Sequence, residues 1–174
     1  MLKINSSKSQ KGNALSLSKG FTLIELLVVI GILAVLLAIT LIAINPARQF
    51  SQANNTKRSS DVTAILNAIG QYAADNKGNL SALGTISTNP LAPTAISDAG
   101  IGDAFCTTLV TEYIAALPAD PLTNNGTAVP DTDCTAAGPA WNTGYTMYKS
   151  AADNRITVTA PLTELGIPAI TVTR

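Results

Sequence analysis

The feature that most constrains this chain is an apolar run from Phe21 to Ile44 that contains a single charged residue, Glu25. A helix over this run would be about 36 Å long, which is enough to cross the hydrocarbon core of a bilayer with some tilt. An ionised side chain in such a segment is costly and usually marks a functional site with a specific partner. The run therefore predicts a membrane-spanning helix, and it raises the question of which group pairs with Glu25.

The residues before this run are basic. Four lysines and no acidic residue precede Phe21, namely Lys3, Lys8, Lys11 and Lys19. This excess of positive charge predicts that the amino-terminal end stays in the cytoplasm and that the rest of the chain faces outward. An ordinary secretory signal has its small-residue cleavage site after the apolar region, whereas here a glycine, Gly20, lies before it. Cleavage after Gly20 would remove a basic leader, residues 1–20, and leave the membrane helix, residues 21–45, in place.

Hydropathy alone leaves open a plain membrane anchor whose glutamate lies near the membrane boundary by accident. Cleavage after Gly20 favours a different interpretation, because it would create an α-ammonium on Phe21 about one helical turn from Glu25. Opposite charges inside a low-dielectric bundle of helices can neutralise each other and fix the register of the helices. Glu25 is therefore a candidate assembly residue.

The segment Gly-Phe-Thr-Leu-Ile-Glu at residues 20–25, with the apolar residues after it, resembles the processing and anchoring signal of type IV pilins and of the pseudopilins of type II secretion. The resemblance implies that a prepilin peptidase in the membrane cuts after Gly20 and N-methylates Phe21. It also implies that Glu25 pairs with a neighbouring subunit and that the partners are copies of the chain or other pilins, together with an assembly platform. The chain would then be a single-pass protein of the cytoplasmic membrane before assembly and part of a cell-surface or periplasm-spanning filament afterwards.

The apolar run ends at Asn45-Pro46, where the proline removes a backbone N–H and predicts a helix kink at Pro46. Apolar residues then recur at spacings of three and four, which predicts an amphipathic helix over residues 46–77 that continues the stalk. Its other face is polar and includes Arg58 and Asp61. Gly78 suits a left-handed cap at the end of this helix.

Residues 78–174 are predicted to form a small globular head. Gly, Ser, Thr, Asn and Pro dominate residues 78–100, which predicts a loop, and a helical pattern returns over residues 103–117. Three segments rich in β-branched or aromatic residues are predicted strands, at residues 145–149, 155–160 and 169–173. The predicted fold class is α+β, in which a long N-terminal helix packs on a small C-terminal antiparallel sheet, as the resemblance to pilins also implies.

The chain has two cysteines, Cys106 and Cys134, and both would lie on the outward side of the membrane. An exported compartment favours a disulfide between them. Closing a loop of this size would stabilise the head by about 3 to 4 kcal/mol on the loop-entropy model. Two buried free thiols are the alternative.

Several oxygen-bearing side chains follow the predicted short helix, namely Asp120, Asn124, Asn125, Asp131 and Asp133. The segment from Leu117 to Pro121 is similar to the head of major pseudopilins, some of which hold calcium. Calcium needs six to eight oxygen ligands, and the spacing here matches no defined calcium loop. Turn formation, clearest at Asn125-Gly126, explains these residues better, so no metal site and no cofactor are predicted.

The composition disfavours enzymes and nucleic-acid binding. The chain has no histidine, so Ser-His-Asp and Cys-His nucleophilic arrangements and histidine-based zinc sites are unavailable. Removal of the leader would take away four of the 11 basic residues and none of the 11 acidic ones, which leaves a mildly acidic mature chain without clustered basic residues. Together with this composition, the resemblance to pilins implies a non-enzymatic structural subunit of a type IV pilus or pilus-like filament. A pseudopilin of a type II secretion machine is the alternative, and a membrane-tethered binding module or hydrolase has the least support.

Overall fold

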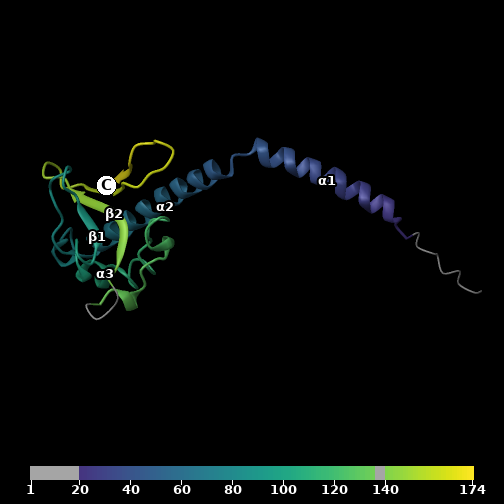
Figure 1. Ribbon diagram of the computed structural model, residues 1–174. Helices are drawn as coiled ribbons and strands as arrows, with labels where there is room; N and C mark the ends of the chain where they lie inside the picture. The colour runs from purple at the N-terminus through teal and green to yellow at the C-terminus, as the bar shows by residue number, and fades with distance from the viewer. Residues whose placement is uncertain (1–19, 136–139) are drawn as a thin grey trace, which may run out of the picture. The chain divides into compact units, whose positions relative to one another are not determined.

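The computed structural model describes residues 20–135 and 140–174, so most of the predicted leader lies outside the described residues. The chain divides into two compact units, the first ending at Ile44 and the second beginning at Asn45 (Figure 1). Among the described residues of the first unit, 20–44, there is one helix, α1 (Leu23–Ala43), which is long and apolar enough to cross a membrane. None of its residues is buried, although apolar side chains occupy every face of the helix.

The second unit begins with a long helix, α2 (Pro46–Asp75), and the interruption at Ile44 and Asn45 separates it from α1. Asn45 caps α2, because its side-chain oxygen accepts a hydrogen bond from the Arg48 N–H at 3.2 Å. Pro46 occupies the first helical position, where a missing N–H costs nothing and the residue before proline is held extended. The local sequence therefore ends one helix and starts the next.

The other end of α2 is closed by two residues with left-handed backbone. Lys77 and Gly78 have φ angles of 54° and 81°. The Gly78 N–H bonds to the Ala73 carbonyl at 2.7 Å, which gives the hydrogen bond of a Schellman cap. The helix ends at Asp75, two residues before the predicted boundary at residue 77.

The head contains a four-stranded antiparallel sheet with the strand order β1-β2-β3-β4. Its strands are β1 (Thr94–Ser97), β2 (Asn142–Lys149), β3 (Ile156–Ala160) and β4 (Ile170–Thr173). The last three overlap the three predicted strands. The interpretation of residues 78–100 as a loop was wrong in part, because β1 and a short 3-10 turn (Ser81–Leu83) lie within it. Strand β1 was missed because it has only four residues and a register shift between Ala95 and Ser97, so its sequence shows no clear alternation.

The predicted helix over residues 103–117 is also too long, because α3 (Asp103–Leu109) ends after seven residues. Thr111 has a φ of 77°, which a helix cannot contain, and its N–H bonds to the Ile114 carbonyl at 2.8 Å instead. The β-branched residues Thr107 and Thr108 near the end of α3 favour helix less than unbranched ones do. Leu117 lies in the loop after α3 and is nevertheless buried. Residues at a spacing of three and four thus enter the core here without forming a helix.

The core of the head lies between α2 and the sheet. The apolar stripe of α2 packs on β3 and β4, and Figure 1 shows α2 entering the head alongside the strands. Its buried residues include Val62, Ile65 and Ile69 of α2 and Tyr145, Met147 and Val158 of the sheet. The disulfide between Cys106 and Cys134 joins α3 to the 3-10 turn Asp131–Asp133, with 5.2 Å between the two Cα atoms. It cross-links a segment that is otherwise fixed by few backbone hydrogen bonds.

Candidate functional site

The amino-terminal turn of α1 holds the carboxylate of Glu25 in a capping box. The Glu25 N–H donates to the Thr22 hydroxyl at 3.2 Å. In return, Oε2 of Glu25 accepts hydrogen bonds from the Thr22 N–H at 2.8 Å and from the Thr22 hydroxyl at 2.7 Å. Oε1 accepts no hydrogen bond from the part of the chain that the structure describes. One oxygen of Glu25 therefore orders the helix end, and the other remains open to a partner.

This arrangement places the predicted site residues together at one end of α1. Gly20 and Phe21 immediately precede the cap, and both are exposed. A shallow hollow at this end of α1 is lined by Glu25 and four apolar residues, Phe21, Ile24, Val28 and Val29. Thr22 was missed as a site residue. The spacing Thr-x-x-Glu before an apolar run is the sequence signature of a capping box and would have found it.

A second polar cluster lies inside the head, where Arg58 is fully buried. Its guanidinium makes two hydrogen bonds to Asp120, with Nε to Oδ2 at 2.6 Å and Nη2 to Oδ1 at 3.1 Å. Nη1 donates to Glu164 and to the side-chain oxygen of Asn55, both at 2.9 Å. The hydrogen bonds to Asp120 are the main reason why the pKa of Arg58 is raised further above its already high value. This cluster joins α2 to two loops of the head.

The polar face of α2 is thus not the solvated surface that helical periodicity alone would suggest. Arg58 is completely buried, and Asn55 and Asp61 are only 7% and 9% exposed. A charged group can be buried in this way only when a partner and hydrogen bonds compensate for the lost hydration. Those partners come from Asp120 and Glu164, which are distant in sequence, and so the helical pattern could not reveal them.

Glu164 anchors the loop between β3 and β4, residues 161–169, to α2. Its carboxylate accepts hydrogen bonds from Ser51 at 3.1 Å and Asn54 at 2.9 Å, and its backbone N–H and C=O both pair with Asn55. The hydrogen bond from Asn54, followed by that from Arg58, lowers the pKa of Glu164 below its usual value. The loop is therefore held in place by several side chains of α2.

A third group of contacts surrounds Asp61. The Tyr145 hydroxyl donates to Oδ2 of Asp61 at 2.7 Å, and Nζ of Lys57 donates to the same oxygen at 2.8 Å. Lys57 also donates to the Ala119 carbonyl at 2.8 Å. Burial is the main cause that raises the pKa of Tyr145 above its usual value, and the neighbouring Asp61 carboxylate raises it further. The arrangement requires the hydroxyl of Tyr145 to remain protonated.

We expect the stability of the head to fall as the pH rises above about 10, the usual pKa of tyrosine. The folded state binds the Tyr145 proton more tightly than the unfolded state does, so this contribution is complete below that pH and is lost above it. Urea unfolding at pH 8 and at pH 10.5 would measure the loss. Tyr145→Phe should reduce the difference in stability between the two pH values; an unchanged difference in this variant, compared with the wild-type chain, would contradict the assignment.

The oxygen-bearing residues considered for calcium have other roles in the structure. Asp120 is occupied by Arg58 and also accepts the Leu122 N–H at 2.8 Å. Asn124 and Asn125 both have left-handed backbone in a turn that ends at Gly126, in agreement with the turn interpretation. Within residues 20–135 and 140–174, no three acidic or cysteine side chains gather as a metal site would require. The segment from Leu117 to Pro121 is thus a structural partner of α2.

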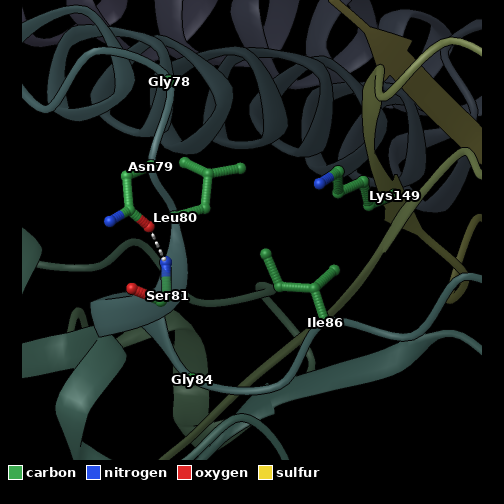
Figure 2. Close-up of a pocket in the computed structure, with 7 residues that line it drawn as sticks. All are labelled: Gly78, Asn79, Leu80, Ser81, Gly84, Ile86 and Lys149. Atoms are coloured by element: carbon green, nitrogen blue, oxygen red, sulfur yellow. Dashed lines mark hydrogen bonds between the residues drawn. The ribbon is translucent and has the colours of Figure 1, made fainter.

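A hollow of about 350 Å³ lies on the head beyond the end of α2 (Figure 2). Its lining consists of Gly78, Asn79, Leu80, Ser81, Gly84, Ile86 and Lys149. Oδ1 of Asn79 accepts the Ser81 N–H at 3.0 Å, which orders one wall, and the amino group of Lys149 projects toward the hollow from the opposite side (Figure 2). Lys149 is the one charged residue among the seven that line the hollow, so the hollow can attract a small anion. Because the lining includes no acid and no thiol, it offers no pair of groups for acid–base chemistry.

The apolar helix with a capped glutamate at its first turn, together with a small antiparallel head covered by a second helix, defines an α+β pilin-like protein. Residues 15–41 match the family model described as the prokaryotic N-terminal methylation motif. This motif is the prepilin signal of type IV pilins and pseudopilins, and the chain carries it. No curated protein and no solved structure is significantly similar to the chain.

Proposed function

We propose that the chain is a structural subunit of a type IV pilus or pilus-like filament that polymerises through α1. The observation that carries the proposal is the prepilin signal at residues 15–41, which includes a helix with apolar side chains on every face. Such a helix must be covered by lipid or by other helices. A filament subunit meets this requirement both before and after assembly, because lipid covers the helix in the membrane and identical helices cover it in the filament.

The capped glutamate supplies a mechanism for the register of assembly. A prepilin peptidase would cut after Gly20 and methylate Phe21, which leaves a secondary ammonium at the new amino terminus. In a packed bundle this ammonium needs a counter-charge, and the open oxygen of Glu25 on a neighbouring subunit can provide it. Thr22 holds the other oxygen, so the carboxylate is oriented before the neighbour arrives.

The expected location follows from the same elements. The basic residues before Phe21 favour a cytoplasmic amino-terminal end, which places the head on the outer side of the membrane. A disulfide between Cys106 and Cys134 suits an oxidising, exported compartment. The partners would be the peptidase, the assembly platform, the membrane, and other pilin subunits.

A pseudopilin of a type II secretion system is the second candidate, favoured by the segment from Leu117 to Pro121 with its similarity to major pseudopilins. In this chain Asp120 of that segment forms the buried pair with Arg58, so it serves the fold of the head. Deletion of the gene separates the two functions. Loss of surface filaments with normal export supports the pilus, and retention of exported proteins inside the cell supports the pseudopilus.

The test of processing is a substitution at the cleavage position. Gly20→Val should block maturation completely, because the peptidase must accommodate the residue before the cut and valine is larger than glycine. Intact-mass and amino-terminal analysis of sheared filaments should show wild-type protein that begins with methylated Phe21. For the variant, membranes should contain only the uncut chain, and no filament should form.

Gly31→Ala is the matched control, since a Cβ built at Gly31 meets no atom within 4 Å and the position lies in the middle of α1. This variant should be processed normally. Mature-sized protein from Gly20→Val, or wild-type filaments that retain the leader, would refute the assigned cleavage site, and absence of the chain from surface filaments would refute the proposed function itself.

A further inference from the structure

The head exposes a group of large apolar side chains close to its attachment point. Three of them, Leu162, Leu165 and Ile167, belong to the β3–β4 loop and are 48%, 47% and 43% exposed. The fourth, Phe50 on α2, is 71% exposed. We call these four residues the loop patch. Figure 1 shows the loop as a yellow segment beside α2.

The loop patch is held outward by the polar contacts of its own loop. Glu164 turns its side chain and backbone toward α2, where Ser51, Asn54 and Asn55 bind it. The Thr163 hydroxyl donates to the Ile167 carbonyl at 2.7 Å and closes the loop on itself. The apolar neighbours of Glu164 are thus fixed on the surface by inward-facing hydrogen bonds.

The position of the patch along the chain determines what it can meet. Leu165 lines one hollow together with Asn45, Arg48 and Ser51, all at the start of α2. Asn45 follows directly on Ile44, the last residue of the apolar run. Phe50 is five residues beyond Asn45, or about 7.5 Å along the helix. The patch therefore lies close to the point where the head joins the apolar run.

The length of α1 places this point at a membrane boundary. Its 21 residues extend about 31 Å, which matches the hydrocarbon core of about 30 Å with little length to spare. If α1 spans the core, Asn45 lies at the outer edge of the core, and Leu165, which lines the same hollow as Asn45, lies near that edge.

We propose that the loop patch contacts the outer headgroup layer of the membrane while the subunit awaits assembly. The proposal rests on the proposed function, which supplies the membrane span. Leucine, isoleucine and phenylalanine side chains insert several ångströms into the boundary between headgroups and acyl chains. Arg48, exposed in the same hollow as Leu165, provides a cation for anionic headgroups. The lipid surface is favoured over a protein partner because the covalent connection to α1 already brings it to the patch.

The test uses the full chain in vesicles of phosphatidylcholine and phosphatidylglycerol that carry a nitroxide quencher on the lipid headgroup or deep in the acyl chain. Single cysteines introduced at chosen positions carry a fluorophore. Cys106 and Cys134 do not react with it, because both are buried and joined in the disulfide. The positions are Leu165→Cys in the patch, Leu91→Cys as the matched control and Val35→Cys in the middle of α1.

Leu91 is a suitable control because it is 93% exposed and lies at the opposite end of the head. Four residues before it, the Ser87 carbonyl accepts the Lys149 N–H, and Lys149 lines a hollow with Gly78 beyond the end of α2. The 30 residues of α2 extend about 45 Å, so this end is far from Asn45.

We expect the headgroup quencher to reduce fluorescence at position 165 and to leave position 91 unchanged, while the deep quencher acts at position 35. Adding Leu162→Ser and Ile167→Ser should restore the fluorescence at position 165.

If position 35 is quenched and position 165 behaves like position 91, the loop patch does not touch lipid although the span is correct. If position 35 is not quenched, the span of the proposed function fails. If fluorescence at position 165 depends on the ratio of protein to lipid and not on the headgroup quencher, a second copy covers the patch and the lipid proposal is overturned.

Discussion

Asp120→Ala should lower the free energy of unfolding of the head by about 3 to 5 kcal/mol, because it leaves the guanidinium of Arg58 buried without its main counter-charge. Asp120 and Arg58 are both completely buried, and two hydrogen bonds join them. The remaining partner, Glu164, is partly exposed and binds a different nitrogen of the guanidinium. It cannot take over the two bonds that Asp120 makes.

Urea unfolding of the full chain in detergent, followed by tryptophan fluorescence, would measure this loss. Trp141 is the one tryptophan of the chain, is 4% exposed and precedes β2, so its emission reports on the core of the head. Asp131→Ala is the matched control, because Asp131 is an exposed acid in the neighbouring 3-10 turn. Replacing both partners, as in Arg58→Met with Asp120→Ala, should recover part of the stability, since no buried charge remains unpaired. Equal stability of the Asp120→Ala and Asp131→Ala variants would contradict the role of the pair.

The second large effect concerns filament formation. Glu25→Val should reduce the yield of filaments by about tenfold or more, because an unpaired buried ammonium costs more than the 1.4 kcal/mol that a tenfold change requires. Membrane insertion should remain intact, since the substitution removes the one charge from the apolar run. Immunoblots of sheared filaments and of membranes, from cells without another major pilin, measure the two quantities separately.

Glu25→Gln separates the two roles of this side chain. Glutamine can replace glutamate in a capping box, so the hydrogen bonds to Thr22 can persist while the charge is lost. We expect Glu25→Gln to assemble as poorly as Glu25→Val, and Thr22→Val, which breaks the cap and keeps the charge, to assemble better than either. Wild-type filament yield from Glu25→Gln would show that capping, and not the charge, is what assembly requires.

The sequence predicted the parts of the fold that depend on local pattern. The apolar run, the proline at position 46 and the β-branched residues of β3 each determine an element through residues that are neighbours in the chain. The polar cluster of the head could not be predicted in this way. Arg58 meets Asp120 and Glu164 across 62 and 106 positions, and only the folded chain brings a cation on the polar face of α2 against these two loops.

The candidate site shows the same division between local and distant information. Glu25 was identified because one charge in an apolar run is conspicuous in sequence, and its cap by Thr22 could have been read from the same six residues. The loop patch required the structure, because its leucines are ordinary residues of a loop until Glu164 fixes them next to the start of α2. Single exposed apolar residues carry little meaning by themselves.

Both outer strands of the sheet, β1 and β4, are only four residues long, and β1 has a register shift. Long, flat and unprotected sheet edges pair edge to edge with other chains and lead to aggregation, and short or irregular edge strands reduce this pairing. Subunits arranged along a filament bring many identical heads to a high local concentration, where such edge pairing would compete with ordered growth. In the proposed filament, the short outer strands would let the heads crowd together without fusing into a continuous β structure, and polymerisation would depend on the apolar helix.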